Sequence, residues 1–265
     1  MPKTSRRIIT LLTDFGTRDH FVGVMKGVIL GIAPEAEIVD ITHDVEPFQI
    51  EQARFLLKNS WRYFPKKTIH VVVVDPGVGS ERRPVLIEAA GHYFVGPDNG
   101  VLGEAVSQEG ARARHITAAR YFLKQVSQTF HGRDVFAPVA AHLTAGVAPG
   151  KFGPIIQDAW RPGLEAPIRS GKRYWVGSVV HIDRFGNLIT NLAADDFPNL
   201  AASKINLAVG MVKINTLVSN YASAPPGEPV CIVGSCGTLE IIINQQSAAK
   251  CLGVGIGAPA ELEIR

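Results

Sequence analysis

The chain has 265 residues, of which 46% are hydrophobic and 19% are charged, and its formal net charge is +3. This composition excludes a mainly disordered protein, and three cysteines are too few for a small disulfide scaffold. Basic residues are scattered and nearly balanced by acidic ones, so no nucleic-acid partner is predicted. The first apolar stretch is short and runs into Asp14, and no apolar run approaches the ~18 residues of a membrane span. We therefore expect a cytoplasmic protein without a signal peptide or membrane contact.

The first part of the chain alternates short apolar runs with segments of helical periodicity. The run at 68–74 is the clearest strand, because continuous β-branched residues suit a sheet that is covered on both faces. The alternation predicts an α/β domain with a largely parallel central sheet over residues 1–148. Its strands are predicted at 8–12, 37–42, 68–74, 84–89 and 92–95, and its helices at 19–32, 50–61, 99–108 and 135–145.

A linker is predicted at 149–171, and the character of the chain changes after it. Between 146 and 171 there are four prolines and five glycines, which favours a surface connection without regular structure. Residues 172–265 then contain short apolar runs separated by turn residues, with no long helix. This pattern predicts a smaller all-β domain, a barrel. Its strands are predicted at 174–182, 187–191, 204–209, 211–216, 230–233, 238–243 and 260–264.

Polar or glycine-rich segments follow two of the predicted strands and precede one of the predicted helices. They are 13–19, 75–83 and 129–134, and the second domain adds 182–187. Ligands of open α/β sheets bind at the carboxyl ends of strands, so these segments are candidates for one site. Each also has a structural explanation. Asp14 is suited to capping a turn, the glycines after Asp75 suit a tight turn without a phosphate-binding lysine, and His131 is compatible with a structural role.

Taken together and in order, the motifs TDFGTRD, VDPGVGSERR, TFHGRD, IDRFGNLITN and GSCGTLEI resemble the S-adenosylmethionine hydroxide adenosyltransferases. This family is related to fluorinase and chlorinase, and the resemblance covers nearly the whole chain. It implies an N-terminal α/β domain, a C-terminal β-barrel and a homotrimer, in which one subunit's C-terminal domain completes its neighbour's site. The implied reaction is hydrolysis of S-adenosyl-L-methionine to adenosine and L-methionine, with no cofactor and no metal.

The resemblance also assigns roles by motif position. The catalytic set of the family matches Asp75, Arg82 and His131, and the residues alone leave open which of them accepts a proton from water. The substrate-binding set matches Asp14 at the ribose diol and Phe48 beside the ribose, Asp19, Asp183 and Ser235 at the methionine end, Phe185, Asn187 and Tyr221 at the adenine, and Gly132 next to the catalytic histidine.

Three other interpretations compete with the hydrolase. A halide-using adenosyltransferase is disfavoured, because the fluorinase type has an inserted loop where 80–99 is compact here, and a tyrosine in place of Asp75. A non-catalytic adenosine or S-adenosylmethionine sensor would keep Asp14, Phe48 and Asn187, but it would not need the catalytic set. The aspartates could also form a metal cluster, which the proposed reaction does not require.

Overall fold

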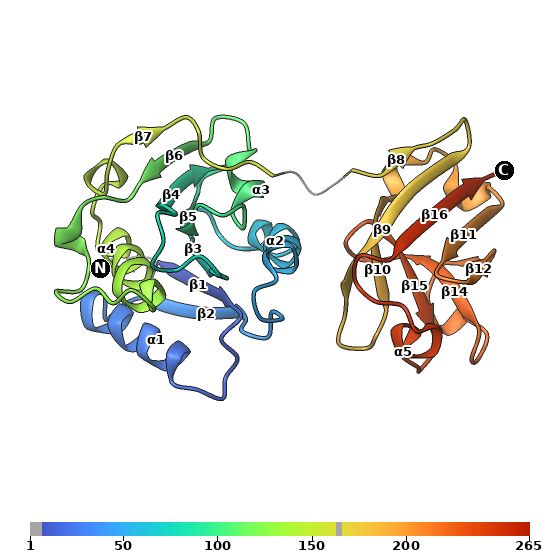
Figure 1. Cartoon of the computed structure of the whole chain (residues 1–265), viewed down its shortest axis with the longest axis horizontal. Coiled ribbons are helices and arrows are strands. Elements are labelled where there is room, and N and C mark those ends of the chain that lie inside the picture. Colours follow the sequence, from blue (N-terminus) through green and yellow to red (C-terminus); the bar gives the residue numbers. More distant parts are fainter. Residues whose placement is uncertain (1–6, 163–165) are drawn as a thin grey trace, which may run out of the picture. The chain divides into compact units, whose positions relative to one another are not determined.

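The computed structural model describes residues 7–162 and 166–265. The chain divides into two compact units, Met1–Gly163 and Leu164–Arg265, which we call unit 1 and unit 2 (Figure 1). Each unit has its own sheet and its own hydrophobic core. Within the described residues, no helix combines the length and the hydrophobicity needed to cross a bilayer.

The sheet of unit 1 is mixed, so the expected largely parallel sheet is not confirmed. Strands β2, β1, β3 and β5 pair in parallel, whereas β5, β4, β6 and β7 pair antiparallel. The reversal begins at the β4–β5 hairpin, whose two-residue turn Ala90-Gly91 has positive φ at both positions, as tight hairpins require. The strands are β1 (Ile8–Thr13), β2 (Glu37–Thr42), β3 (Ile69–Val73), β4 (Pro84–Ala89), β5 (His92–Pro97), β6 (Arg112–His115) and β7 (Ile155–Ile156).

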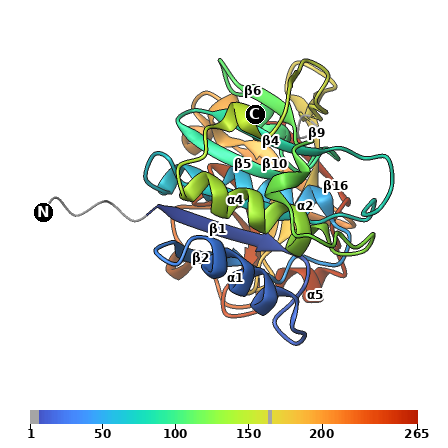
Figure 2. The same ribbon diagram turned by 90° about the vertical axis from the view of Figure 1, so that its left-hand side faces the viewer.

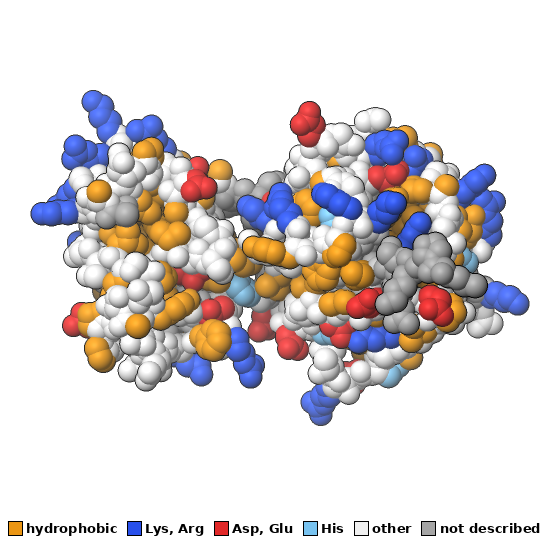
Figure 3. Space-filling model, turned by 180° about the vertical axis from the view of Figure 1, so that it is seen from behind, with side chains coloured by type: hydrophobic (Ala, Val, Ile, Leu, Met, Phe, Trp, Pro, Cys, Tyr) orange, Lys and Arg blue, Asp and Glu red, His pale blue; other side chains and the backbone are white. Residues whose placement is uncertain are grey.

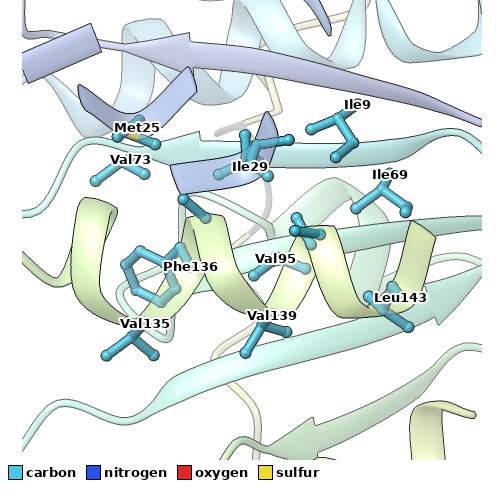
Figure 4. Close-up of a cluster of buried hydrophobic side chains, with 14 of the residues drawn as sticks. Ile9, Met25, Ile29, Ile69, Val73, Val95, Val135, Phe136, Val139 and Leu143 are labelled. Atoms are coloured by element: carbon cyan, nitrogen blue, oxygen red, sulfur yellow. The ribbon is translucent and has the colours of Figure 1, made fainter. Parts of the chain in front are cut away.

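Helices cover both faces of this sheet. On one face lie α1 (Phe21–Ile32) and α4 (Ala137–Thr144) (Figure 2), and their apolar side chains pack against alternate residues of the central strands (Figure 4). The residues in between on the same strands join the second core cluster, with α2 (Ile50–Lys58) and α3 (Gly103–Val106). Burial on both faces explains why the 68–74 run is apolar except for Thr68 and His70.

Several predicted elements are shorter or differently built than expected. The helix predicted at 50–61 ends at Lys58, and only α3 forms within 99–108. A π-helical turn, Gly132–Phe136, precedes α4, so the predicted 135–145 helix starts with a wider turn. Regular structure also occurs inside the predicted linker, since β7 pairs with β6 and β8 (Ile168–Arg169) pairs with β9 (Tyr174–Ile182).

Unit 2 is built mainly from one sheet, with strand order β12-β11-β16-β9-β10-β15-β14-β13. No pairing joins the two outer strands within 166–265, and a short helix, α5 (Ala248–Leu252), follows β15, so the expected all-β barrel is not confirmed. The predicted strands are found, with β13 in addition. The bounds are β9 (Tyr174–Ile182), β10 (Leu188–Ala193), β11 (Ile205–Val209), β12 (Val212–Ile214), β13 (Leu217–Val218), β14 (Pro229–Val233), β15 (Thr238–Ile243) and β16 (Pro259–Ile264).

Candidate active site

Two predicted site residues follow neighbouring parallel strands of unit 1. Asp14 comes directly after β1 and Asp75 follows β3, and these strands pair in parallel register. Their carboxyl ends therefore lie at the same edge of the sheet. Arg82 stands just before β4, which runs in the opposite direction, so the start of β4 reaches this edge too. The topology thus brings together residues that are far apart in sequence.

Arg82 links the other two residues of the predicted catalytic set. Its Nε donates to Asp75 Oδ1 at 2.9 Å, its Nη2 donates to Asp75 Oδ2, and Nη2 also lies 2.9 Å from His131 Nδ1. The side chains of Arg82 and Asp75 are only 9% and 5% exposed. Charge-assisted bidentate pairs of this kind fix both partners in orientation. The third guanidinium nitrogen, Nη1, is buried and has no hydrogen-bond partner within the described residues.

This geometry determines which nitrogen of His131 carries the proton. A guanidinium group has only donors, so the Nδ1 that faces Arg82 must be the acceptor. In the neutral imidazole, the proton then resides on Nε2. Burial, followed by the positive charge of Arg82, lowers the pKa of His131 below its ordinary 6.5, which keeps the ring neutral at neutral pH.

A pocket of about 290 Å³ opens in front of this set. It is lined by five predicted site residues: Asp14, Phe48, Asp75, His131 and Gly132. Arg82 does not line it, so the guanidinium group supports Asp75 and His131 from behind.

Aromatic side chains that were not predicted form one wall of the pocket. The rings of Phe15 and Phe21 each meet that of Phe130 edge to face, at centroid distances of 5.7 and 5.2 Å. Phe15 follows Asp14 and Phe130 precedes His131, and that proximity in sequence was the available signal. Phe21 has no predicted residue next to it. The pocket therefore pairs an apolar wall with a polar one, as expected for a small organic ligand.

Asp14 and Phe48 are held together by the backbone. Asp14 Oδ2 accepts a hydrogen bond from the Phe48 amide at 2.9 Å. Phe48 has φ 69°, an uncommon conformation for a non-glycine residue, and its side chain is 69% exposed. Burial raises the pKa of Asp14, an effect that the Phe48 amide opposes. A strained residue that presents an uncovered aromatic ring beside a pocket is typical of a ligand-binding position.

Gly132 leads the π-helical turn that follows His131. A Cβ on it would lie 3.2 Å from the Phe130 ring and 3.3 Å from the Met25 sulfur, so the position has little room for a side chain. Such turns are frequent at functional sites. Asp19 is different: it is exposed in the loop before α1 and does not line the pocket.

The remaining predicted residues belong to unit 2. Asp183 Oδ1 accepts from the amides of Phe185 and Asn187, both at 2.9 Å, and Oδ2 accepts from Asn187 Nδ2 at 2.8 Å. Asp183 therefore organises the 183–187 loop. The loop buries Asn187 and leaves the Phe185 ring 79% exposed.

Tyr221 and Ser235 lie on other segments of unit 2. Tyr221 is half exposed in a 3₁₀ turn, Tyr221–Ser223, and Ser235 is exposed in the turn between β14 and β15. Burial raises the pKa of Tyr221, and the charges of Glu240 and Asp183 raise it further. Glu240 is a residue that the sequence interpretation missed, although it is the one charged residue of the quoted GSCGTLEI motif.

Two family models match the chain. Residues 9–153 match the SAM hydroxide adenosyltransferase N-terminal domain, and residues 177–261 match the SAM hydroxide adenosyltransferase C-terminal domain. Together they account for most of both units.

Curated relatives and a solved structure agree with these matches. A protein of Methanocaldococcus jannaschii named (R)-S-adenosyl-L-methionine hydrolase is 38% identical, covering 93% of this chain and 92% of that protein. One of the same name from Thermus thermophilus is 34% identical, covering 97% and 99%. A fluorinase of an Actinoplanes species is 27% identical, covering 92% and 93%. The crystal structure of an uncharacterized conserved protein from Thermotoga maritima has a TM-score of 0.88 at 37% identity, covering 96% of this chain and 99% of that one.

Proposed function

Because this chain belongs to the S-adenosylmethionine hydroxide adenosyltransferase family, we propose that it is an enzyme that hydrolyses S-adenosylmethionine to adenosine and methionine. Relatives at 33–38% identity that carry the name (R)-S-adenosyl-L-methionine hydrolase support this reaction. The observation that carries it in this chain is the Arg82 bridge between Asp75 and His131 at a pocket that also contains Asp14.

The reaction joins a water oxygen to C5′ of the ribose and breaks the C5′–S bond. The bonding electron pair goes to sulfur, so methionine leaves as a neutral thioether and needs no general acid. The attacking water becomes a protonated alcohol, which is far more acidic than water. A carboxylate is therefore a sufficient proton acceptor late in the transition state. Holding water in line with the C–S bond lowers the barrier by orientation alone.

We assign the proton acceptance to Asp75 and the orientation of water to His131. Neutral His131 carries its proton on Nε2, so this nitrogen donates to the water oxygen and leaves an oxygen lone pair free to attack. It is not available as a base in that tautomer. Each Asp75 oxygen accepts one bond from Arg82 and keeps a second lone-pair direction for the water proton. Arg82 acts behind them as the positioning residue.

For substrate binding we propose that Asp14 receives the two hydroxyls of the ribose diol and that Phe48 packs beside the sugar. Asp19, Asp183 and Ser235 are proposed for the methionine end. For the adenine we propose Phe185, Asn187 and Tyr221. Gly132 is proposed to keep the turn after His131 tight, because a side chain there would meet Phe130 and Met25.

We further propose a homotrimer in which unit 2 of one chain completes the pocket of unit 1 in a neighbouring chain. Support comes from uncovered aromatic rings, since Phe48 of unit 1 and Phe185 of unit 2 are each more than two-thirds exposed within the chain. Hydrophobic side chains are visible on the surface of both units (Figure 3). Exposed apolar groups at a ligand site are typical of surfaces that a partner covers.

The test is turnover of purified protein in chloride-free buffer with each sulfonium epimer of S-adenosyl-L-methionine, because the relatives' name specifies the R form. We expect adenosine and methionine in equal amounts from the R form, and strongly reduced product from Asp75→Asn. Arg83→Lys is a control that stays outside the pocket, because Arg83 pairs with Asp98 and Asp158. Tight adenosine binding without product would overturn the hydrolase in favour of a sensor, and a chlorinated adenosine formed on adding chloride would indicate the halide reaction.

A further inference from the structure

Glu240 is a charged residue in the middle of an apolar strand of unit 2. Its neighbours on β15, Leu239 and Ile241, point into the main core of the unit. Glu240 therefore projects from the opposite face of the sheet. There it is in register with Ile189 of β10 on one side and Ile232 of β14 on the other. A carboxyl group placed between two isoleucines is costly to keep unless something interacts with it.

No such group is present within unit 2. Glu240 is 4% exposed, and its carboxyl group forms no hydrogen bond or ion pair with any residue in 7–162 or 166–265. One of its oxygens lies against the backbone of Gly234, in the space that a side chain at that position would need. Gly234 begins the turn that carries Ser235, so the carboxyl group contacts a segment already proposed to bind the methionine end.

The surroundings of Glu240 are negative. The nearby charge of Asp183 adds to burial in raising the pKa of Glu240. The charges of Glu240 and Asp183 also raise the pKa of Tyr221. Arg184, the cation next to Asp183 in the loop, is exposed and forms no ion pair with either carboxylate within the described residues. Two unneutralised carboxylates and a phenol make a site for a cation.

We propose that Glu240 is a substrate-binding residue whose carboxylate, together with that of Asp183, receives the α-ammonium group of S-adenosylmethionine. This inference rests on the proposed function. It adds a second, buried carboxylate to the methionine end, and it explains why a charged residue occupies an otherwise apolar face. Burial makes the interaction strong, because a charge-assisted bond away from water is screened least.

The proposal makes binding dependent on pH. The pKa of Glu240 is raised to about 7, so the free protein holds it partly protonated at neutral pH. The groups that face it are Asp183 after β9 and Tyr221 of the 3₁₀ turn, while His181 of β9 lies one strand beyond Ile189. Cys231 of β14 is in register with Ile241 and belongs to the core on the opposite face, although the charge of Glu240 still reaches it. The pKa values of Tyr221 and Cys231 are raised and that of His181 is lowered, so these three remain neutral near pH 7. Substrate affinity should therefore increase as pH rises from 6 to 7, a range in which the substrate's α-ammonium group keeps its proton.

The experiment compares the full-length wild type with Glu240→Gln, which keeps the shape but removes the charge. Glu261→Gln, an exposed position on β16, is the matched control. We expect KM for S-adenosylmethionine to rise about tenfold or more in Glu240→Gln, with kcat within threefold of wild type and no pH dependence of KM between 6 and 7. The Glu261→Gln control should match wild type in KM, in kcat and in the pH dependence of KM.

A substrate analogue without the amino group separates this role from others. Wild type and Glu240→Gln should bind the deamino analogue equally, because the missing ammonium is the group that Glu240 contacts. An equal loss with both ligands would instead assign Glu240 to the adenine or to unit stability, and unchanged KM would overturn the proposal outright. Absence of turnover by the wild type would contradict the proposed function, and calorimetric binding of the two ligands would still decide the role of Glu240.

Discussion

A single guanidinium group determines the protonation of its neighbours in the candidate site. Arg82 offers only donors, so it requires an ionised Asp75 and an unprotonated Nδ1 on His131. Sequence alone left open whether Asp75 or His131 accepts the proton from water. The direction of this one hydrogen bond favours Asp75, because the remaining nitrogen of His131 already carries a proton.

The pH dependence of turnover follows from the state of His131. Its pKa is lowered below the ordinary 6.5, so kcat at saturating substrate should be constant from about pH 6.5 to 8. His131→Gln, which can still place a donor near Nε2, should retain more kcat than His131→Leu. Stopped assays across this range measure both effects. A kcat that rises steeply between pH 6.5 and 8 would contradict the assignment, since it would indicate a base that titrates there.

A second histidine should make unit 1 sensitive to acid. His70 is buried in β3, where Nδ1 lies 2.8 Å from Thr10 Oγ1 and Nε2 lies 3.3 Å from His92 Nδ1. Burial lowers its pKa to about 3, so the folded state excludes a proton that the unfolded chain takes up below its usual 6.5. The free energy of unfolding is therefore unaffected by His70 above pH 6.5. Between pH 6.5 and pH 3 it falls by about 1.4 kcal/mol per pH unit, because the unfolded chain binds a proton at His70 that the folded state does not.

Denaturant unfolding at pH 7, 5.5 and 4.5 checks this expectation. His70→Gln removes the titrating ring, so the free energy of unfolding of that variant should depend less on pH than that of wild type. Parallel pH curves for the two proteins would show that the ring is not the source of the acid sensitivity.

At the scale of elements, the loop after β1 depends on a buried threonine. Thr13 Oγ1 lies 2.9 Å from His43 Nδ1 and accepts from the Phe15 amide at 3.2 Å, and the Gly16 amide donates to the His43 carbonyl at 2.8 Å. These contacts hold the loop that carries Asp14. Thr13→Val should therefore raise KM for substrate severalfold as well as lowering stability by about 1–3 kcal/mol, the usual cost of leaving buried polar groups unpaired.

The same strand supplies a matched control for this loop. Thr10 also has a buried hydroxyl next to a histidine, but its partner His70 lies away from the pocket. Thr10→Val should lower stability by a similar amount and leave KM unchanged. Steady-state kinetics and unfolding curves on both variants distinguish the cases, and equal KM values for the two would mean that the loop needs no anchor at Thr13.

Most elements could be predicted from sequence, because apolar runs and turn residues mark them locally. Strands β2, β4, β9 and β15 have the predicted bounds. Pairing direction could not be predicted in this way. The Ala90-Gly91 turn lacks the usual asparagine–glycine signal, so the hairpin that makes the sheet mixed was missed.

Site residues that belong to a sequence motif could be predicted, whereas site residues that only the packing of the fold brings to the pocket could not. Asp14, Asp75 and His131 are in the pocket, whereas Phe21 lies on its wall through the rotation of α1, which no motif specifies. Glu240 was missed because its importance depends on which face of β15 is covered. That is a property of the assembled sheet.

For the whole molecule, the proposed trimer can be tested by mixing inactive chains. Asp75→Asn disables unit 1, and Phe185→Asp changes an exposed ring of unit 2 without touching the core. If each site combines units from two chains, random mixed trimers regain about a quarter of wild-type activity. Half of all copies of unit 1 and half of all copies of unit 2 are unmutated, and an active site needs one unmutated copy of each. Refolding equal amounts together and assaying adenosine measures this. If each chain forms its own site, the mixture stays as inactive as its components.

The position of β16 in unit 2 has a consequence for how the protein is made. This strand pairs with β9 on one side and β11 on the other, although it follows both in the chain. A ribosome releases β9 and β11 first, so each has an unpaired edge until β16 emerges, and open edges invite association with other chains. Unit 1 completes its sheet at β7, well before that point. Unit 2 is therefore the part of the nascent protein that depends most on a dilute or chaperoned environment.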